Sequence, residues 1–287
     1  MEYVLRRASL ELLKDWIFEM KKSIGNIFIG LMYTLLYAPL LVMVFFSFNE
    51  AKSTSVFTGF SLKWYRELFS SSQTMTALRN TLILAVLSAI IATVIGTAAA
   101  VYIFYVRSKA WKTTLDFVTN IPMMNPDIVT GVSLMLLFVF VGRAIGAANS
   151  LSFGTLLIAH VTFNLPYVIL NVLPKLHQTD PYIYQAAQDL GSTPVQAFFK
   201  VVMPAIMPGI MSGMLMSFTL SLDDFVISYY TTGSSFQTLP LLIFSMTKKV
   251  VKPDMYALST LIFVTVLVVL LAVNIGQIKA ARKEEKK

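Results

Sequence analysis

Long stretches of apolar residues without any charge constrain this chain more than any other feature of its sequence. Four such stretches run for 24 to 26 residues each: 24–48, 81–106, 151–174 and 255–278. A fifth stretch, 117–141, is interrupted only by Asp127, and a sixth, 201–230, only by Asp223 and Asp224. A helix needs about 20 apolar residues to cross the hydrocarbon core of a bilayer. The sequence therefore predicts an all-α membrane protein with six transmembrane helices.

The overall composition supports this interpretation. Hydrophobic residues make up 56% of the chain and charged residues 13%, whereas soluble domains carry about 25% charged residues. The long apolar runs argue against an outer-membrane barrel, whose strands alternate apolar and polar residues. The chain has no cysteine, which excludes disulfides, thiolate zinc sites and a cysteine nucleophile.

The distribution of Lys and Arg predicts the orientation in the membrane. Six spans with an inner N-terminus would place four segments inside: 1–23, 107–116, 175–200 and 279–287. These segments contain 15 of the 23 Lys and Arg residues, and the outer segments contain 8. The positive-inside rule then favours a cytoplasmic N-terminus and a cytoplasmic C-terminus. The net charge of +8 indicates contact with membrane lipid rather than with nucleic acid.

Two terminal segments flank the single predicted membrane domain, 24–278. Segment 1–23 combines basic residues with apolar residues near helical spacing, which predicts a cytoplasmic amphipathic helix on the membrane surface. A frayed basic tail is the alternative for this segment. Segment 279–287 reads as a cytoplasmic basic tail.

Residues 180–204, between the fourth and fifth spans, carry the signals of two short helices joined by a tight turn. Asp180, followed by a proline, is typical of a helix N-terminus. Gly191 can adopt the left-handed conformation that ends a helix. Thr193 and Gln196 have the spacing of a capping box that starts a second helix.

The same segment resembles the "EAA" loop of ABC-importer permeases. That pattern is Glu-Ala-Ala, three residues, Gly, nine residues and Ile-x-Leu-Pro, and the spacing here agrees at every position. Val201 and Met203 are conservative replacements, and Gln185 removes the charge of the family Glu. The resemblance implies that this coupling loop docks on an ATPase subunit, with Ala186 and Ala187 providing a small face. The implied coupling residues are Gln185, Ala186, Ala187, Gly191 and Pro204.

Further segments are similar to the spermidine/putrescine (PotC-like) family of these permeases. They are 63–65, 123–129, 187–191, 217–224 and 239–241, and the resemblance covers about residues 25–278. It implies the type I ABC importer permease (MetI-like) fold and a multi-pass location in the bacterial inner membrane. It also implies a function, which is the translocation of polyamines into the cytoplasm by alternating access.

The three aspartates within the apolar stretches are candidate substrate residues. A charge near the bilayer centre costs roughly 2.5–3.5 kcal/mol or more, and the six stretches contain no Lys or Arg. Acids without cations suit a pathway for a molecule with several ammonium groups. Asp223 and Asp224 are neighbours and point about 100° apart on a helix, so one can meet substrate while the other holds a partner helix. The alternatives are an inter-subunit hydrogen bond or ion pair for these two, and a helix cap after the Pro126 break for Asp127.

Three other side chains near these regions call for an interpretation. Ser221 lies near the aspartate pair and can bond an amine. Trp64 follows the first span in a predicted outer loop, where its ring could attract an ammonium group or anchor the chain at the interface. The family resemblance associates Ser221 and Trp64 with uptake. His160 reads as a structural hydrogen-bond partner of a neighbouring helix.

The sequence lacks a G-x-x-x-x-G-K-[ST] phosphate loop and an H-E-x-x-H metal motif. We therefore expect a non-catalytic subunit without catalytic residue, metal site or cofactor, with ATP and Mg bound by a partner ATPase. The resemblance implies three partners: a homologous second permease (PotB-like), two copies of the ATPase (PotA-like) and a periplasmic or extracellular solute-binding protein (PotD-like). The alternatives are a permease for another cation, such as ferric iron or thiamine, a stand-alone secondary transporter or channel, and a membrane enzyme.

Overall fold

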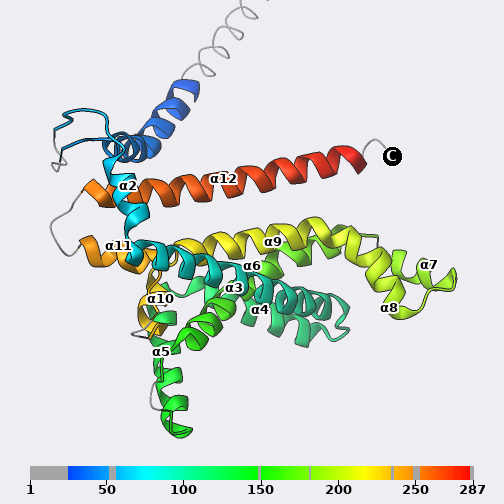
Figure 1. Ribbon diagram of the computed structural model, residues 1–287. Coiled ribbons are helices and arrows are strands. Elements are labelled where there is room, and N and C mark those ends of the chain that lie inside the picture. Colours follow the sequence, from blue (N-terminus) through cyan, green and yellow to red (C-terminus); the bar gives the residue numbers. More distant parts are fainter. Residues whose placement is uncertain are drawn as a thin grey trace, which may run out of the picture. The chain divides into compact units, whose positions relative to one another are not determined.

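The computed structural model describes residues 25–51, 56–147, 150–180, 182–233, 236–247 and 253–284. Most of these residues are helical, and their one isolated β-bridge is an antiparallel pairing of Asn49 with Phe60. The predicted all-α class is confirmed for this part of the chain (Figure 1). The predicted amphipathic segment 1–23 lies outside the described residues, as does 285–287 of the predicted basic tail.

A first helix, Gly25–Phe46, precedes the other helical elements, whose α-helices are labelled in Figure 1. In chain order these are α2 (Lys63–Ser70), α3 (Ser72–Tyr105), α4 (Lys109–Met124), α5 (Asp127–Ala144), α6 (Phe153–Gln178), α7 (Ile183–Asp189), α8 (Pro194–Ala197), the π-helical turn η1 (Phe198–Val202), α9 (Met203–Asp223), α10 (Val226–Thr231), α11 (Leu239–Thr247) and α12 (Pro253–Glu284).

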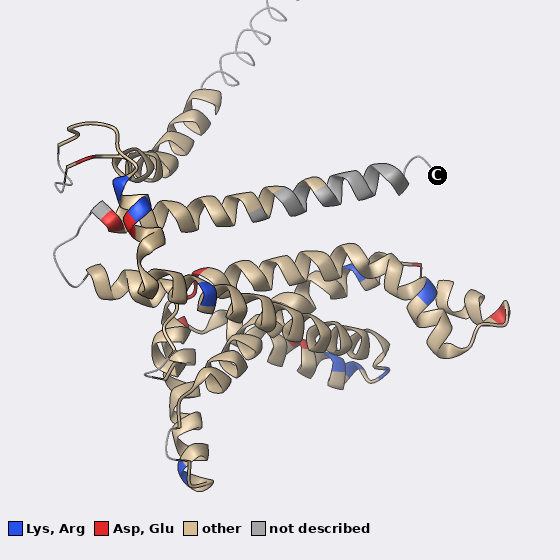
Figure 2. Ribbon diagram, viewed as in Figure 1, with Lys and Arg blue, Asp and Glu red and all other residues tan. Residues whose placement is uncertain are grey.

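Five helical stretches are long and apolar enough to cross a membrane: Gly25–Phe46, α3, α5, α6 and Pro194–Asp223. The sixth predicted span falls on α12, a 32-residue helix whose described apolar part is Asp254–Val268. Figure 2 shows long uncharged stretches along α3, α6 and α9. The chain is therefore a multi-pass membrane protein, as the sequence predicts.

The third predicted span, 117–141, is divided in the structure. Helix α4 ends at Met124 and α5 begins at Asp127, so only α5 is a span. Proline lacks a backbone N–H and disfavours helical geometry in the residue before it, which explains the break at Asn125 and Pro126. Asp127 consequently lies at a helix start rather than inside a helix.

The fifth predicted span, 201–230, is also divided. Helix α9 ends at Asp223, and α10 begins at Val226. The backbone of Asp224 is extended, with ψ at 125°. By contrast, α6 continues from Phe153 to Gln178 through Pro166. Prolines are tolerated within membrane helices when neighbouring groups satisfy the freed backbone.

The chain forms two compact units. The smaller one contains the described residues of 25–66 and 253–260. Asn49 organises its loop, because the side-chain amide donates to the Val56 carbonyl over 2.7 Å and accepts from the Thr58 N–H over 2.9 Å. The same loop receives the Trp64 indole N–H, which donates to the Asn49 carbonyl over 2.7 Å.

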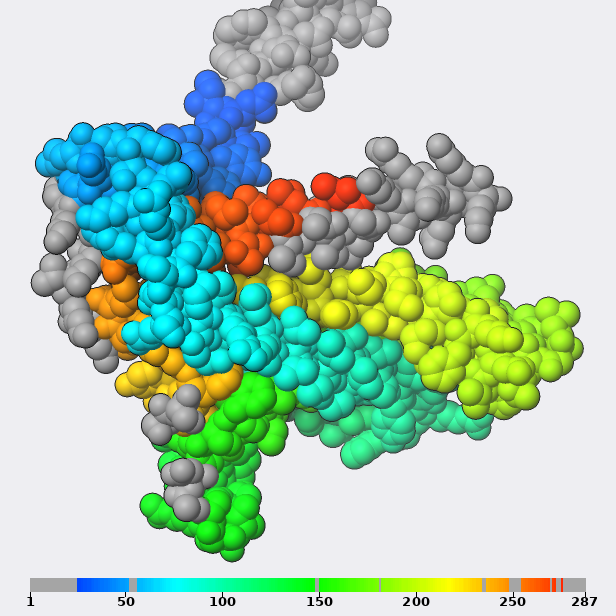
Figure 3. Space-filling view, in the orientation of Figure 1, coloured from blue at the N-terminus to red at the C-terminus, as the bar shows by residue number. Residues whose placement is uncertain are grey.

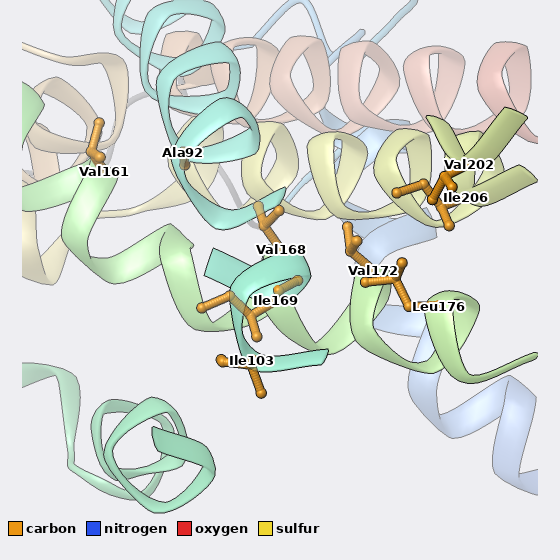
Figure 4. Close-up of a cluster of buried hydrophobic side chains, with 10 residues drawn as sticks. Ala92, Ile103, Val161, Val168, Ile169, Val172, Leu176, Val202 and Ile206 are labelled. Atoms are coloured by element: carbon orange, nitrogen blue, oxygen red, sulfur yellow. The ribbon is translucent and has the colours of Figure 1, made fainter. Parts of the chain in front are cut away.

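The larger unit contains the described residues of 67–247 and 261–284, and α3, α6 and α9 pack against one another within it. Their apolar side chains meet in one buried cluster (Figure 4). Its members are Ala92, Ala100, Ile103, Val161, Val168, Ile169, Val172, Leu176, Val202 and Ile206.

Small residues allow this close approach of α3, α6 and α9. A Cβ atom added to Gly96 would lie 2.7 Å from Val168, and one added to Gly209 would lie 2.7 Å from the Asn171 carbonyl oxygen. In a bilayer, such small residues permit the van der Waals contact that holds helices together.

Short helices cover the end of this bundle where α3 and α6 begin. Helix α10 packs against α5 and α6, and α11 packs against α3. The Leu239 N–H donates to the Thr81 hydroxyl over 2.7 Å, which fixes the start of α11 on α3. A Cβ on Gly131 of α5 would lie 3.0 Å from the Tyr230 ring of α10. This packing places the helix that follows Asp127 beside the helix that follows Asp223.

Candidate functional site

Two regions of the larger unit carry the candidate functional residues. The first is the coupling loop, residues 180–204, which joins α6 to α9 through α7, α8 and η1. The second is the α9–α10 break, residues 223–225. In Figure 3 the coupling loop (yellow-green) lies at one end of the helices that it joins.

The turn in the coupling loop has the predicted geometry. Gly191 has φ at +86°, and its N–H donates to the Gln188 carbonyl over 2.8 Å. The Ser192 N–H donates to the Ala187 carbonyl over 3.0 Å. These two bonds form a Schellman motif, which ends α7 and requires a left-handed residue at Gly191.

The two predicted helix starts have different outcomes. The Thr193 hydroxyl accepts from the Gln196 N–H, and the Gln196 side chain accepts from the Thr193 N–H, so the predicted capping box is confirmed. The Asp180 carboxylate accepts from the Tyr182 N–H over 2.9 Å, but α7 begins only at Ile183. The first helix is therefore shorter than predicted, and the proline at 181 lies outside the described residues.

A π-helical turn connects this loop to α9. Pro204, the second residue of α9, has no N–H to donate, so the backbone cannot continue the α-helical bond pattern there. The Met203 N–H instead donates to the Phe198 carbonyl, which closes the wider π turn. The proline of the EAA-like pattern thus sets how the coupling loop enters the fifth span.

The face predicted for docking needs a correction. Ala187 is 7% exposed and packs within the loop, because α7 lies against α8 and η1. Gln185 and Ala186 are exposed. Larger apolar side chains also face outward, led by Leu190, which is 89% exposed, with Tyr182, Val195 and Phe199. These four side chains are not among the coupling residues predicted from the sequence.

A hollow of about 370 Å³ lies beside these residues. It is lined by Tyr105 from the end of α3 and by Tyr184, Pro194, Val195, Phe198 and Phe199 of the coupling loop. Exposed apolar surface next to a hollow is typical of a protein interaction site. The loop therefore presents an exposed apolar surface of the kind that binds a partner protein.

At the α9–α10 break the two aspartates differ in environment. Asp224 is nearly buried, and its carboxylate accepts from the Ile227 N–H over 3.2 Å and from the Ser228 N–H over 2.8 Å. It therefore caps the start of α10. Asp223, the last residue of α9, is exposed. The prediction that the two point to different surroundings is consistent with this geometry.

His160 of α6 forms the centre of a buried polar network at this break. Its Nδ1 lies 2.5 Å from the Ser221 hydroxyl, and its Nε2 lies 3.0 Å from the Ser228 hydroxyl and 3.4 Å from the Asp224 carboxylate. Ser221 also bonds to Ser88 of α3 over 2.7 Å. The predicted hydrogen bond of His160 to a neighbouring helix is confirmed, and the network joins α3, α6, α9 and α10.

Two predicted substrate contacts are placed elsewhere by the structure. Ser221 is buried between Ser88 and His160, so its hydroxyl is used inside the helix bundle. Trp64 lies in α2 rather than in a loop and is 5% exposed. The Lys63 ammonium lies 5.2 Å from the centre of its ring, so one cation already faces it. Both placements favour a packing role.

Asp127 and Asp223 are the two candidate acids that remain exposed. Asp127 is the first residue of α5, where the helix dipole favours a negative charge. It thus stands at the start of a helix that packs against α10, and α10 begins three residues after Asp223. Of the described residues predicted to contact substrate, these two aspartates have carboxylates that a solute can reach.

Comparison with known proteins identifies relatives over most of the chain. Residues 92–279 match the family described as "Binding-protein-dependent transport system inner membrane component". The putrescine transport system permease protein PotI of Escherichia coli K12 is 40% identical over 230 residues, or 80% of this chain and 82% of that protein. The spermidine/putrescine permease PotC of the same strain is 38% identical over 247 residues, or 85% and 90%.

A solved structure shows the same fold. One chain of a bacterial ABC transporter that imports the acidic polysaccharide alginate has a TM-score of 0.71, with coverage of 95% of this chain and 99% of that chain. The sequence identity is 16%, so this likeness concerns the fold alone. It confirms the predicted type I ABC importer permease (MetI-like) fold, and the homology covers both the coupling loop and the α9–α10 break. The chain thus belongs to the family of inner-membrane components of binding-protein-dependent transport systems.

Proposed function

We propose that this chain is the permease subunit of an ATP-driven importer that carries spermidine, putrescine or both into the bacterial cytoplasm by alternating access. The observation that carries the proposal is the pair of exposed carboxylates, Asp127 and Asp223, at helix breaks within apolar stretches that contain no Lys or Arg. The relatives PotI and PotC, which are named for putrescine and for spermidine/putrescine, support the same substrate class.

The geometry suits a cation with several ammonium groups. An ammonium that leaves water needs a counter-charge, and a carboxylate provides it. Asp223 stands at the C-terminus of α9, where the unpaired backbone carbonyls carry a further partial negative charge. Broken helices at a binding site use both groups in other transporters. Asp127, at the start of α5, provides a second carboxylate, and two carboxylates on different helices match a substrate with separated charges.

The coupling loop supplies the mechanical link in this proposal. Leu190 and its apolar neighbours dock on an ATPase subunit, which binds ATP and Mg and moves the loop when it closes. A homologous second permease (PotB-like) completes the pathway, two ATPase copies (PotA-like) face the cytoplasm, and a solute-binding protein (PotD-like) delivers substrate from outside. Both termini and the coupling loop are cytoplasmic in this arrangement, and the chain itself catalyses no bond chemistry.

Uptake of labelled spermidine and putrescine tests the substrate class. The chain is co-expressed with its partner subunits, and Asp223→Asn and Asp127→Asn are compared with the wild type. Asp116→Asn in α4 is the matched control, because it makes the same change outside the apolar stretches. We expect about tenfold or greater loss in the first two variants, since each lost charged contact contributes about 1.5–3 kcal/mol, and no loss in the control.

Competition by unlabelled solutes addresses other cations. We expect spermidine or putrescine to compete with labelled substrate, and ferric iron and thiamine to have no effect. Uptake that persists in both aspartate variants, with assembly intact, would overturn the cation pathway. Competition by thiamine or ferric iron alone would keep the permease and replace the substrate.

A further inference from the structure

The α9–α10 break is held by one buried side chain from another helix. His160 of α6 is 1% exposed and contacts three residues around the break. Its Nδ1 bonds to Ser221, and its Nε2 bonds to Ser228 and lies 3.4 Å from the Asp224 carboxylate. In the chain, the exposed Asp223 therefore lies between Ser221 and Asp224, which both contact His160.

The two ring nitrogens of His160 contribute differently to the conformation of the break. Ser221 lies two residues before the end of a 21-residue helix, whose own backbone bonds already hold it in place. Helix α10 has six residues, which is too short to be stable by itself. Its start depends on the Asp224 cap and on Ser228, and both contact Nε2. The Nε2 side thus fixes the direction in which the chain leaves Asp223.

Contacts outside this network also hold the helices together. Close packing at Gly96, Gly209 and Gly213 already joins α3, α6 and α9. The two ring nitrogens of His160 bond to residues on opposite sides of the helix break. The ring therefore fixes the backbone conformation of the segment that contains the exposed Asp223.

We propose that His160 is a positioning residue for substrate, which holds the Asp223 carboxylate in its binding orientation through Asp224 and Ser228. This proposal rests on the proposed function, because it assumes that Asp223 meets the transported cation. His160 itself does not contact substrate. Replacing His160 lowers the affinity of the pathway for the transported cation, although the negative charge of Asp223 remains.

Two amide substitutions separate the two nitrogens. In His160→Gln the amide reaches the position of Nε2 and keeps the contacts with Ser228 and Asp224. In His160→Asn the shorter amide reaches the position of Nδ1 and keeps only the contact with Ser221. Apparent KM and maximal rate of labelled polyamine uptake are measured for each variant in the complete transporter and divided by the amount of assembled complex.

We expect His160→Asn to raise the apparent KM about tenfold, since it removes the bonds at Asp224 and Ser228. His160→Gln should recover most of the affinity, and the maximal rate per assembled complex should change little in either variant. An unchanged KM in His160→Asn, or an equal effect of both variants, would overturn the positioning role. Loss of assembled complex with normal KM in the remainder would assign His160 to helix association only.

Asp223→Asn in the same assay separates this proposal from the proposed function. If Asp223→Asn has wild-type kinetics, the substrate contact itself is wrong. If Asp223→Asn raises the KM and His160→Asn does not, only the role of His160 is wrong. Ser88→Ala is the matched control, because it removes a bond of Ser221 while leaving the Nε2 side of His160 intact.

Discussion

The coupling loop and the α9–α10 break are both interruptions between helices, but they are built in opposite ways. The coupling loop satisfies its polar backbone locally, through Gly191 and the capping box of Thr193, and turns apolar side chains such as Leu190 outward. The break places the Asp224 carboxylate in a buried polar network and takes its partner, His160, from a distant helix. A region whose conformation is fixed by neighbours in sequence can offer its side chains to a partner. A region fixed by tertiary contacts instead depends on the whole bundle.

The largest expected effect comes from a charge on the exposed apolar tip of the coupling loop. Leu190→Asp should abolish uptake and ATPase association, because a buried interface residue contributes about 2–4 kcal/mol and an unpaired charge there costs more. Co-purification of the ATPase and labelled polyamine uptake measure both effects. Ile145→Asp is the matched control, since Ile145 is 75% exposed but lies at the end of α5. Equal loss in both variants would contradict a specific docking surface.

A second prediction compares two glycines with positive φ. Gly191 in the coupling loop has φ at +86°, and Gly146 after α5 has φ at +70°, and a Cβ would meet no atom at either position. Alanine at each should therefore cost about 1–2 kcal/mol of backbone strain. We expect uptake to fall about five- to tenfold in Gly191→Ala only. Thermal stability should fall similarly in both, and an uptake defect in Gly146→Ala alone would reverse the assignment.

The third prediction concerns the cap within the break. Asp224→Ala removes the acceptor for two backbone N–H groups and should destabilise the chain by about 1–2 kcal/mol. Asp224→Asn keeps a good cap and should cost less than half of that amount. The melting temperature of each purified variant in detergent provides the measurement. A larger loss in the asparagine variant would show that the charge facing His160, rather than the cap, stabilises the break.

The smallest effect is expected from restoring the family glutamate. Gln185→Glu places a charge on an exposed position of α7, and an exposed ion pair contributes about 0–1 kcal/mol. ATPase association should strengthen by less than about fivefold, and the gain should disappear at high salt. A weaker association at low salt would show that the facing surface of the ATPase is acidic at this point.

Much of the fold follows from the sequence because the bilayer imposes a simple rule. Every backbone polar group must be paired within the membrane, so an apolar run of sufficient length must be helical. Six runs predicted six helical spans, and five described helical stretches are long and apolar enough to cross a membrane, while the sixth run falls on α12. The turn at Gly191 and the capping box at Thr193 were predicted for a similar reason, because each depends on residues within a few positions.

The tertiary structure decided which polar side chains are available. Ser221, Asp223 and Asp224 are close in sequence, yet Asp223 is exposed while the other two face His160, and nothing in the sequence placed His160 beside them. Trp64 and Ala187 were expected at surfaces and proved to be buried, since the loop around Asn49 and the turn η1 cover them. Exposure depends on what packs across from a residue. The sequence by itself therefore determined the apolar helical stretches and the turn and capping box of the coupling loop, and only the packing of α3, α6, α9 and α10 determined which carboxylate can meet a solute.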